Sequence, residues 1–85
     1  MLPIVHITDV KNKGKKIEVT YKGQTISRTT KKEYTHVIIA IGYSGKLIEF
    51  GYSGRYDLAK KKYDECNKIK EKMNWNELQI VKLEA

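Results

Sequence analysis

The stretch of sequence that decides the fold is "VIIAIGYSGKLIEFGYSGR", residues 37–55, in which an apolar run precedes two copies of Gly-Tyr-Ser-Gly plus a cation. In an extended chain, successive side chains point to opposite faces of the sheet. Both faces of the run are apolar, with Val37, Ile39 and Ile41 on one and Ile38 and Ala40 on the other. This pattern is typical of a strand covered on both sides. We therefore predict a central strand at 37–41.

The two copies of Gly-Tyr-Ser-Gly have different surroundings, which predict different structures. The first copy lies between the apolar run and a second short strand, "LIEF", so its glycines suit a hairpin turn. The second copy precedes a stripe of apolar residues at helical spacing, formed by Tyr56, Ala59, Tyr63, Cys66, Ile69 and Met73. We expect a helix to begin there, with Ser53 as its N-cap and Asp57 near the positive end of the helix dipole.

The remaining segments read as strands. "PIVHITDV" at 3–10 alternates apolar and polar residues, "KIEVTYKGQTISRTT" at 16–30 reads as a hairpin turning at Lys22-Gly23, and "ELQIVKLEA" at 77–85 reads as a return strand. The order is β-β-β-β-β-α-β. We predict one small two-layer α+β domain over 1–85, in which an antiparallel sheet of about five to six strands packs on one amphipathic helix.

The composition argues against most catalytic sites. A chain of 85 residues has a thin core, and its single cysteine, Cys66, excludes an internal disulfide. The only histidines, His6 and His36, form no pair with metal-ligand spacing, and neither Ser44 nor Ser53 lies in a recognisable nucleophile elbow. No apolar run approaches the roughly 20 residues that span a bilayer. We expect a cytoplasmic, non-enzymatic protein, a monomer or weak homodimer, without metal, cofactor or membrane.

The charge is the most informative global property. Seventeen Lys and Arg oppose ten Asp and Glu, and residues 1–40 alone carry a net charge of +5. Such an excess favours association with polyanions or acidic protein surfaces, although it also promotes solubility. Two basic segments stand out as candidate contacts to phosphate, Lys11, Lys13, Lys15 and Lys16 in the first and Arg28, Lys31 and Lys32 in the second.

The two Gly-Tyr-Ser-Gly copies supply further candidate contacts. Their tyrosines could stack on a base or anchor a protein interface, and a cation follows each copy; the candidates are Tyr43, Lys46, Tyr52 and Arg55. At the expected helix N-terminus, Ser53, Gly54 and Arg55 form a candidate anion site. The alternative is that Ser53 only caps its helix and Arg55 is solvated.

Two functions remain open from the sequence. The small size, the Lys/Asn/Ile-rich composition and the lack of catalytic residues resemble accessory proteins encoded by phages and mobile elements, although no motif carries the resemblance. That class includes inhibitors of CRISPR effectors, which would work in a bacterial host cytoplasm. We expect a protein that binds nucleic acid or a nucleoprotein complex through its basic surface. The alternative is an inhibitor that binds an acidic surface of a host defence protein.

Overall fold

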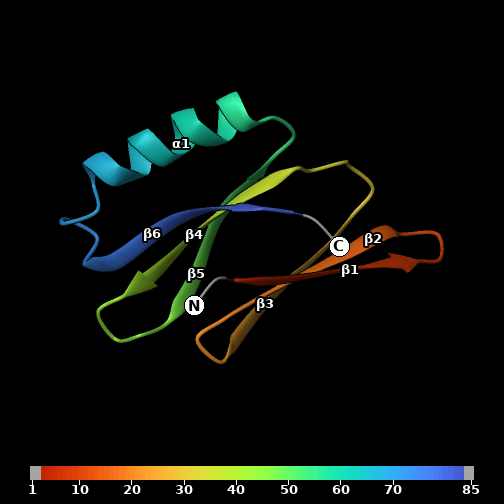
Figure 1. Cartoon of the computed structure of the whole chain (residues 1–85), viewed down its shortest axis with the longest axis horizontal. Coiled ribbons are helices and arrows are strands. Elements are labelled where there is room, and N and C mark those ends of the chain that lie inside the picture. The colour runs from red at the N-terminus through yellow and green to blue at the C-terminus, as the bar shows by residue number, and fades with distance from the viewer. Residues whose placement is uncertain (1–2, 84–85) are drawn as a thin grey trace.

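A computed structural model of the chain describes residues 3–83, and its elements follow the predicted order (Figure 1). They are β1 (Ile4–Val10), β2 (Gly14–Tyr21), β3 (Gln24–Thr30), β4 (His36–Gly42), β5 (Leu47–Ser53), α1 (Tyr56–Lys68) and β6 (Trp75–Lys82). All strand pairs are antiparallel. The predicted α+β class, with antiparallel strands and one helix, is confirmed.

The six strands divide between two sheets, which the sequence did not indicate. The first sheet has the order β1-β2-β3, and the second has the order β5-β4-β6. The division falls at the polar connection 31–35, which carries the chain from β3 in one layer to β4 in the other. Figure 1 shows α1 along one side of the second sheet and the first sheet on its other side.

Strand β4 is the centre of the molecule because each of its faces belongs to a different core. Val37, Ile39 and Ile41 pack against Ile17, Val19 and Tyr21 of the first sheet. Ile38 and Ala40 pack with Ala59, Cys66, Trp75 and Leu78 beneath the helix. The prediction of a central strand covered on both faces is confirmed, and the second cover is a sheet.

The apolar stripe of α1 is shorter than predicted. Ala59 and Cys66 are buried, and Tyr63 is half-buried against the same core. The other members of the stripe are exposed, namely Tyr56, Ile69 and Met73. Because α1 ends at Lys68, Ile69 and Met73 lie beyond the helix and do not follow its spacing. Tyr56 is the first residue of the helix.

Both predicted hairpin turns are present. β2 and β3 are joined by the two residues Lys22 and Gly23, and the first Gly-Tyr-Ser-Gly copy closes the β4–β5 turn, where the Gly45 amide donates to the Gly42 carbonyl at 2.9 Å.

The second copy does not start the helix, so the assignment of Ser53 as N-cap was wrong. Gly51 lies at a β-bulge, and Ser53 is the last residue of β5, opposite His36 of β4 and only 8% exposed. Its carbonyl accepts a hydrogen bond from the Thr35 amide at 2.8 Å. The N-cap is Arg55, with extended backbone and no side-chain capping bond. Pairing with β4 therefore holds Ser53 in the sheet.

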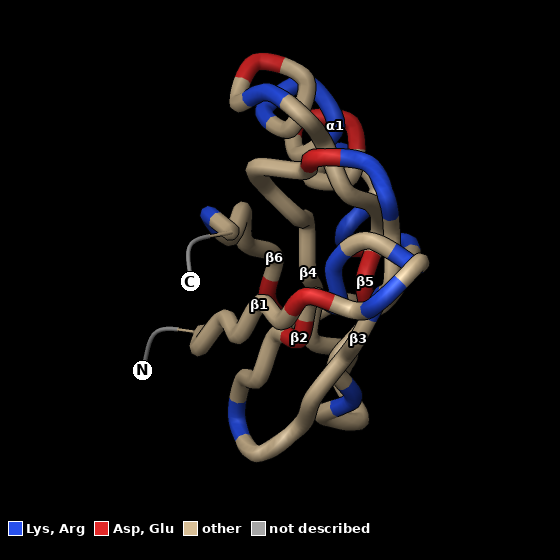
Figure 2. The backbone as a smooth tube through the Cα atoms, turned by 90° about the vertical axis from the view of Figure 1, so that its right-hand side faces the viewer, with Lys and Arg blue, Asp and Glu red and all other residues tan. Residues whose placement is uncertain are grey.

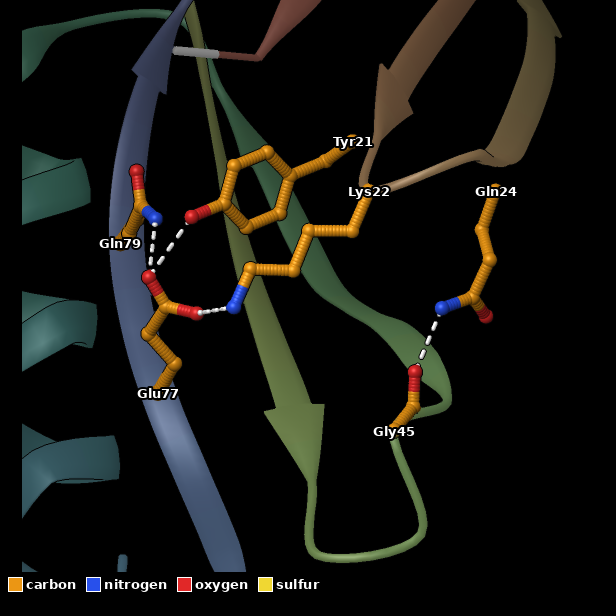
Figure 3. Close-up of polar contacts among 6 residues, drawn as sticks. All are labelled: Tyr21, Lys22, Gln24, Gly45, Glu77 and Gln79. Carbon is orange, nitrogen blue, oxygen red and sulfur yellow. Dashed lines mark hydrogen bonds and ion pairs between the residues drawn. The ribbon is translucent and has the colours of Figure 1, made fainter. Parts of the chain in front are cut away.

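The two sheets are tied together at the β2–β3 turn (Figure 3). The Tyr21 hydroxyl donates to Oε1 of Glu77 on β6 at 2.7 Å, and the Lys22 ammonium lies 2.9 Å from Oε2. Beside them, the Gln24 side chain accepts from the Leu47 amide at 2.8 Å and donates to the Gly45 carbonyl. At this end of the molecule, polar contacts therefore join the first sheet to the second.

The Glu77 contacts predict an acid-sensitive stability. The Lys22 ammonium and then the Tyr21 hydroxyl lower the pKa of the Glu77 carboxyl from its usual 4.5. A carboxyl with a lower pKa in the folded state stabilises the fold at neutral pH, and this stabilisation is lost as the pH falls through the folded pKa. We expect the melting temperature to fall below about pH 4.5, and to fall less steeply in Glu77→Gln.

The control for this pH series is Glu71→Gln, at an exposed carboxylate without a side-chain hydrogen bond or ion pair among residues 3–83. Its melting profile should follow that of the unmodified protein. If Glu77→Gln and Glu71→Gln gave the same acid slope, Glu77 would not be the titrating group.

Candidate functional site

The strand register brings the two basic segments together at the end opposite the Glu77 contacts. Lys15 and Lys16, at the start of β2, lie opposite Thr30 and Thr29, at the end of β3. The β1–β2 turn leads into this end of β2, and the 31–35 connection leaves this end of β3. The result is one group, here called the basic end: Lys11, Lys13, Lys15, Lys16, Lys31 and Lys32. Figure 2 looks onto this side, where blue segments gather.

The lysines of the basic end are available to an external anion. All six are exposed. The carboxylates closest along the chain are Asp9, which lies opposite Lys15 in the register, Glu18, which lies two residues after Lys16 in β2, and Glu33. Ion pairs within residues 3–83 join other cations, Lys22, Arg55 and Lys60, to Glu77, Asp57 and Asp64. Positive charge therefore accumulates here without internal neutralisation by an ion pair.

Gly14 holds the two basic segments close to each other. Its φ is +87°, and a Cβ at this position would overlap the Thr30 carbonyl oxygen and lie 2.8 Å from Lys31 Cα. The β1–β2 turn can therefore approach the 31–35 connection only because position 14 has no side chain.

The end of β5 lies beside the same connection. A Cβ at Gly54 would be 3.4 Å from the Glu33 carbonyl oxygen, and Arg55 is exposed next to it. However, Arg55 Nε lies 3.5 Å from Asp57 Oδ1, so the first turn of α1 supplies its own carboxylate. The anion-binding assignment of Ser53, Gly54 and Arg55 stays a prediction, with Ser53 buried and Arg55 already paired.

The structure separates the remaining candidates from the basic end. Tyr43, which is 68% exposed, and Lys46 lie in the β4–β5 turn at the opposite end of the strands (Figure 1). Tyr52 lies within β5 and is half-buried, rather than at a loop tip. Its hydroxyl and Glu49 Oε2 are buried and have no hydrogen-bond partner within residues 3–83. Burial, more than the neighbouring Glu49 carboxylate, raises the pKa of the Tyr52 hydroxyl.

Arg28 lies over two tyrosines rather than among the lysines. Its guanidinium carbon is 5.3 Å from the centre of the Tyr52 ring and 5.9 Å from that of Tyr34, and the two rings are 5.3 Å apart. Contacts of a guanidinium with aromatic rings at this distance are attractive. They help to fix Tyr34, which was not among the candidate residues predicted from the sequence.

A hollow of about 280 Å³ opens beside Tyr34 at the basic end. Its floor consists of Ile7, Ile17, Tyr34 and Leu83, and its rim of Lys15, Lys32, Glu33 and Thr35. The sequence predicted the two rim lysines as contacts. The floor was missed because its members come from four separate segments, and only the position of Tyr34 directly after Lys31-Lys32-Glu33 offered a signal.

Two further features, a metal-ligand cluster and a membrane-spanning helix, are not found within residues 3–83. Among residues 3–83, no three His, Cys, Asp or Glu side chains are grouped so that they could hold a metal ion. None of the helical structure described is long and apolar enough to cross a membrane. No protein-family model, curated protein or solved structure shows significant similarity to this chain.

Proposed function

We propose that the protein is a non-enzymatic binding module that holds nucleic acid, free or within a nucleoprotein complex, through the phosphates at its basic end. The observation that carries this proposal is the strand register, which brings together at one end six exposed lysines from two separate segments, none of them in an ion pair within residues 3–83. A polyanion with regularly spaced charges satisfies such an array better than a single small anion does.

The residue types favour contacts to phosphate over recognition of base sequence. Lysine is a compact, strongly hydrated charge on a flexible stem, whereas arginine provides the fixed fork that reads guanine edges. The basic end holds lysines, and the nearby Arg28 is engaged with Tyr34 and Tyr52. Binding should therefore be nearly independent of sequence and strongly dependent on salt.

The test is a salt titration with labelled DNA and RNA. We expect a triple lysine-to-serine variant of the basic end to bind all sequences more weakly. Its slope of log affinity against log salt should fall by about 2 to 3, because every phosphate that a lysine neutralises adds about 0.7 to 0.9 to that slope. Fluorescence anisotropy measures both quantities. The residues replaced are Lys11, Lys13 and Lys16, which leaves Lys15 and Lys32 in place.

A matched control changes the same net charge elsewhere. Replacing three exposed lysines in and after α1 by serine removes three positive charges, but most of the slope of log affinity against log salt should remain. The residues replaced are Lys61, Lys68 and Lys72. Equal losses in the two variants would mean that net charge, and not the basic end, governs binding. If an acidic polypeptide bound with the same dependence on the basic end and on salt, while DNA and RNA did not bind, the alternative function, an inhibitor of a host defence protein, would be favoured.

A further inference from the structure

We propose that the hollow at the basic end receives one unpaired base of a single-stranded nucleic acid, so that the protein prefers single strands to duplex. This inference rests on the proposed nucleic-acid binding and adds a substrate class to it. It assigns a role to Tyr34 and to the apolar floor, which phosphate binding alone does not use.

The size of the hollow suits a small ring system. Its volume of about 280 Å³ lies just below the range of about 300 to 1,000 Å³ that is typical of sites for drug-sized ligands. A group of one or two rings fits such a space. A paired and stacked stretch of duplex does not, because only a base that has left its stack can enter a pocket.

The lining offers contacts for the face of a base. Tyr34 contributes an aromatic ring, and its neighbours Tyr52 and Arg28, at 5.3 and 5.9 Å, restrict its movement. Ile7 and Leu83 provide apolar contacts on the rest of the floor. Stacking on such surfaces tolerates any base, in agreement with binding that does not read sequence.

The rim places charge where the backbone of the same strand would run. Lys15 and Lys32 border the hollow and belong to the basic end, so phosphates on either side of an inserted base would meet lysines. The Glu33 carboxylate and the Thr35 hydroxyl are the other polar groups of the rim. An apolar floor below two ammonium groups matches a nucleotide, which has an apolar ring face and an anionic phosphate.

The first test compares three ligands with the unmodified protein: a labelled single strand of about 12 nucleotides in DNA and RNA versions, the corresponding duplex, and an abasic strand of equal length. We expect the single strand to bind about tenfold more tightly than the other two, as one stacked base contributes. Equal affinities for all three ligands would overturn the base site and leave phosphate binding standing. No binding to any of them would overturn both proposals.

The second test blocks the hollow without changing charge. Ile7→Trp should fill it and bring single-strand affinity down to that of the duplex. Ile4→Trp is the matched control, because Ile4 is 65% exposed on the opposite face of β1, far from the basic end, and should change neither affinity. Tyr34→Leu, which keeps apolar volume but removes the ring, should also reduce single-strand affinity alone. Full single-strand preference in folded Ile7→Trp and Tyr34→Leu would contradict the inference.

Discussion

Replacing Gly14 by alanine is expected to lower the free energy of unfolding by about 2 to 5 kcal/mol. Two costs combine at this position. A residue with a side chain is strained at a φ of +87°, and the new Cβ would collide with backbone, the Thr30 carbonyl and Lys31 Cα. Backbone atoms in a paired strand end cannot rotate away as a flexible side chain would. The start of β2 and the 31–35 connection must therefore separate.

Gly45→Ala is the matched control, because Gly45 has the same φ of +87° but a methyl group added there would meet no atom of residues 3–83 within 4 Å apart from its two chain neighbours. It should lose only the strain, about 1 to 2 kcal/mol. Urea unfolding of both variants measures the difference. Equal losses would show that the Gly14 contact relaxes easily, and that the two basic segments are not held at a fixed separation.

The Gly14 variant also tests how the site is built. If the close approach of the two segments matters for binding, folded Gly14→Ala should bind nucleic acid more weakly than Gly45→Ala, although neither substitution removes a charge. Binding that depends only on net charge would be the same in both variants.

Periodicity predicted the parts of the fold that depend on local sequence. The apolar run 37–41 predicted the central strand because the side chains on both of its faces are apolar, and Lys22-Gly23 predicted the hairpin because turn preferences depend on local sequence. Ser53 was misplaced because capping and strand-end positions favour similar residues, and pairing with His36 decided between them. That pairing is a long-range contact that no spacing reports.

For the candidate site, too, the sequence predicted the local features and missed the long-range ones. The lysines of both basic segments were visible as composition, but their meeting depends on the β2–β3 register, and the exclusion of Tyr43 and Lys46 depends on which ends of the strands coincide. The hollow could not be predicted, because Ile7 and Leu83 are distant in sequence and line the same hollow only through the tertiary fold.

The neighbouring residues Ile38 and Ile39 provide the last prediction, since both are at most 1% exposed but they face different layers. Ile39 lies between the two sheets and Ile38 lies beneath α1. Alanine at either position should cost about 2 to 5 kcal/mol, a large part of the total of roughly 4 to 13 kcal/mol expected for a domain of this length. The milder change to valine, at about 0.5 to 1.5 kcal/mol, keeps both proteins folded for comparison.

The two valine variants should loosen different layers, which amide hydrogen exchange can resolve. Ile39→Val should raise exchange mainly in β1–β3, and it should weaken single-strand binding because Ile39 shares its core with Ile17 and Leu83, which line the hollow. Ile38→Val should raise exchange mainly in α1 and leave binding unchanged, since the helix contributes none of the residues that line the hollow. Identical exchange patterns in both variants would show that the layers unfold as one unit, and the first sheet could not then move independently of the helix.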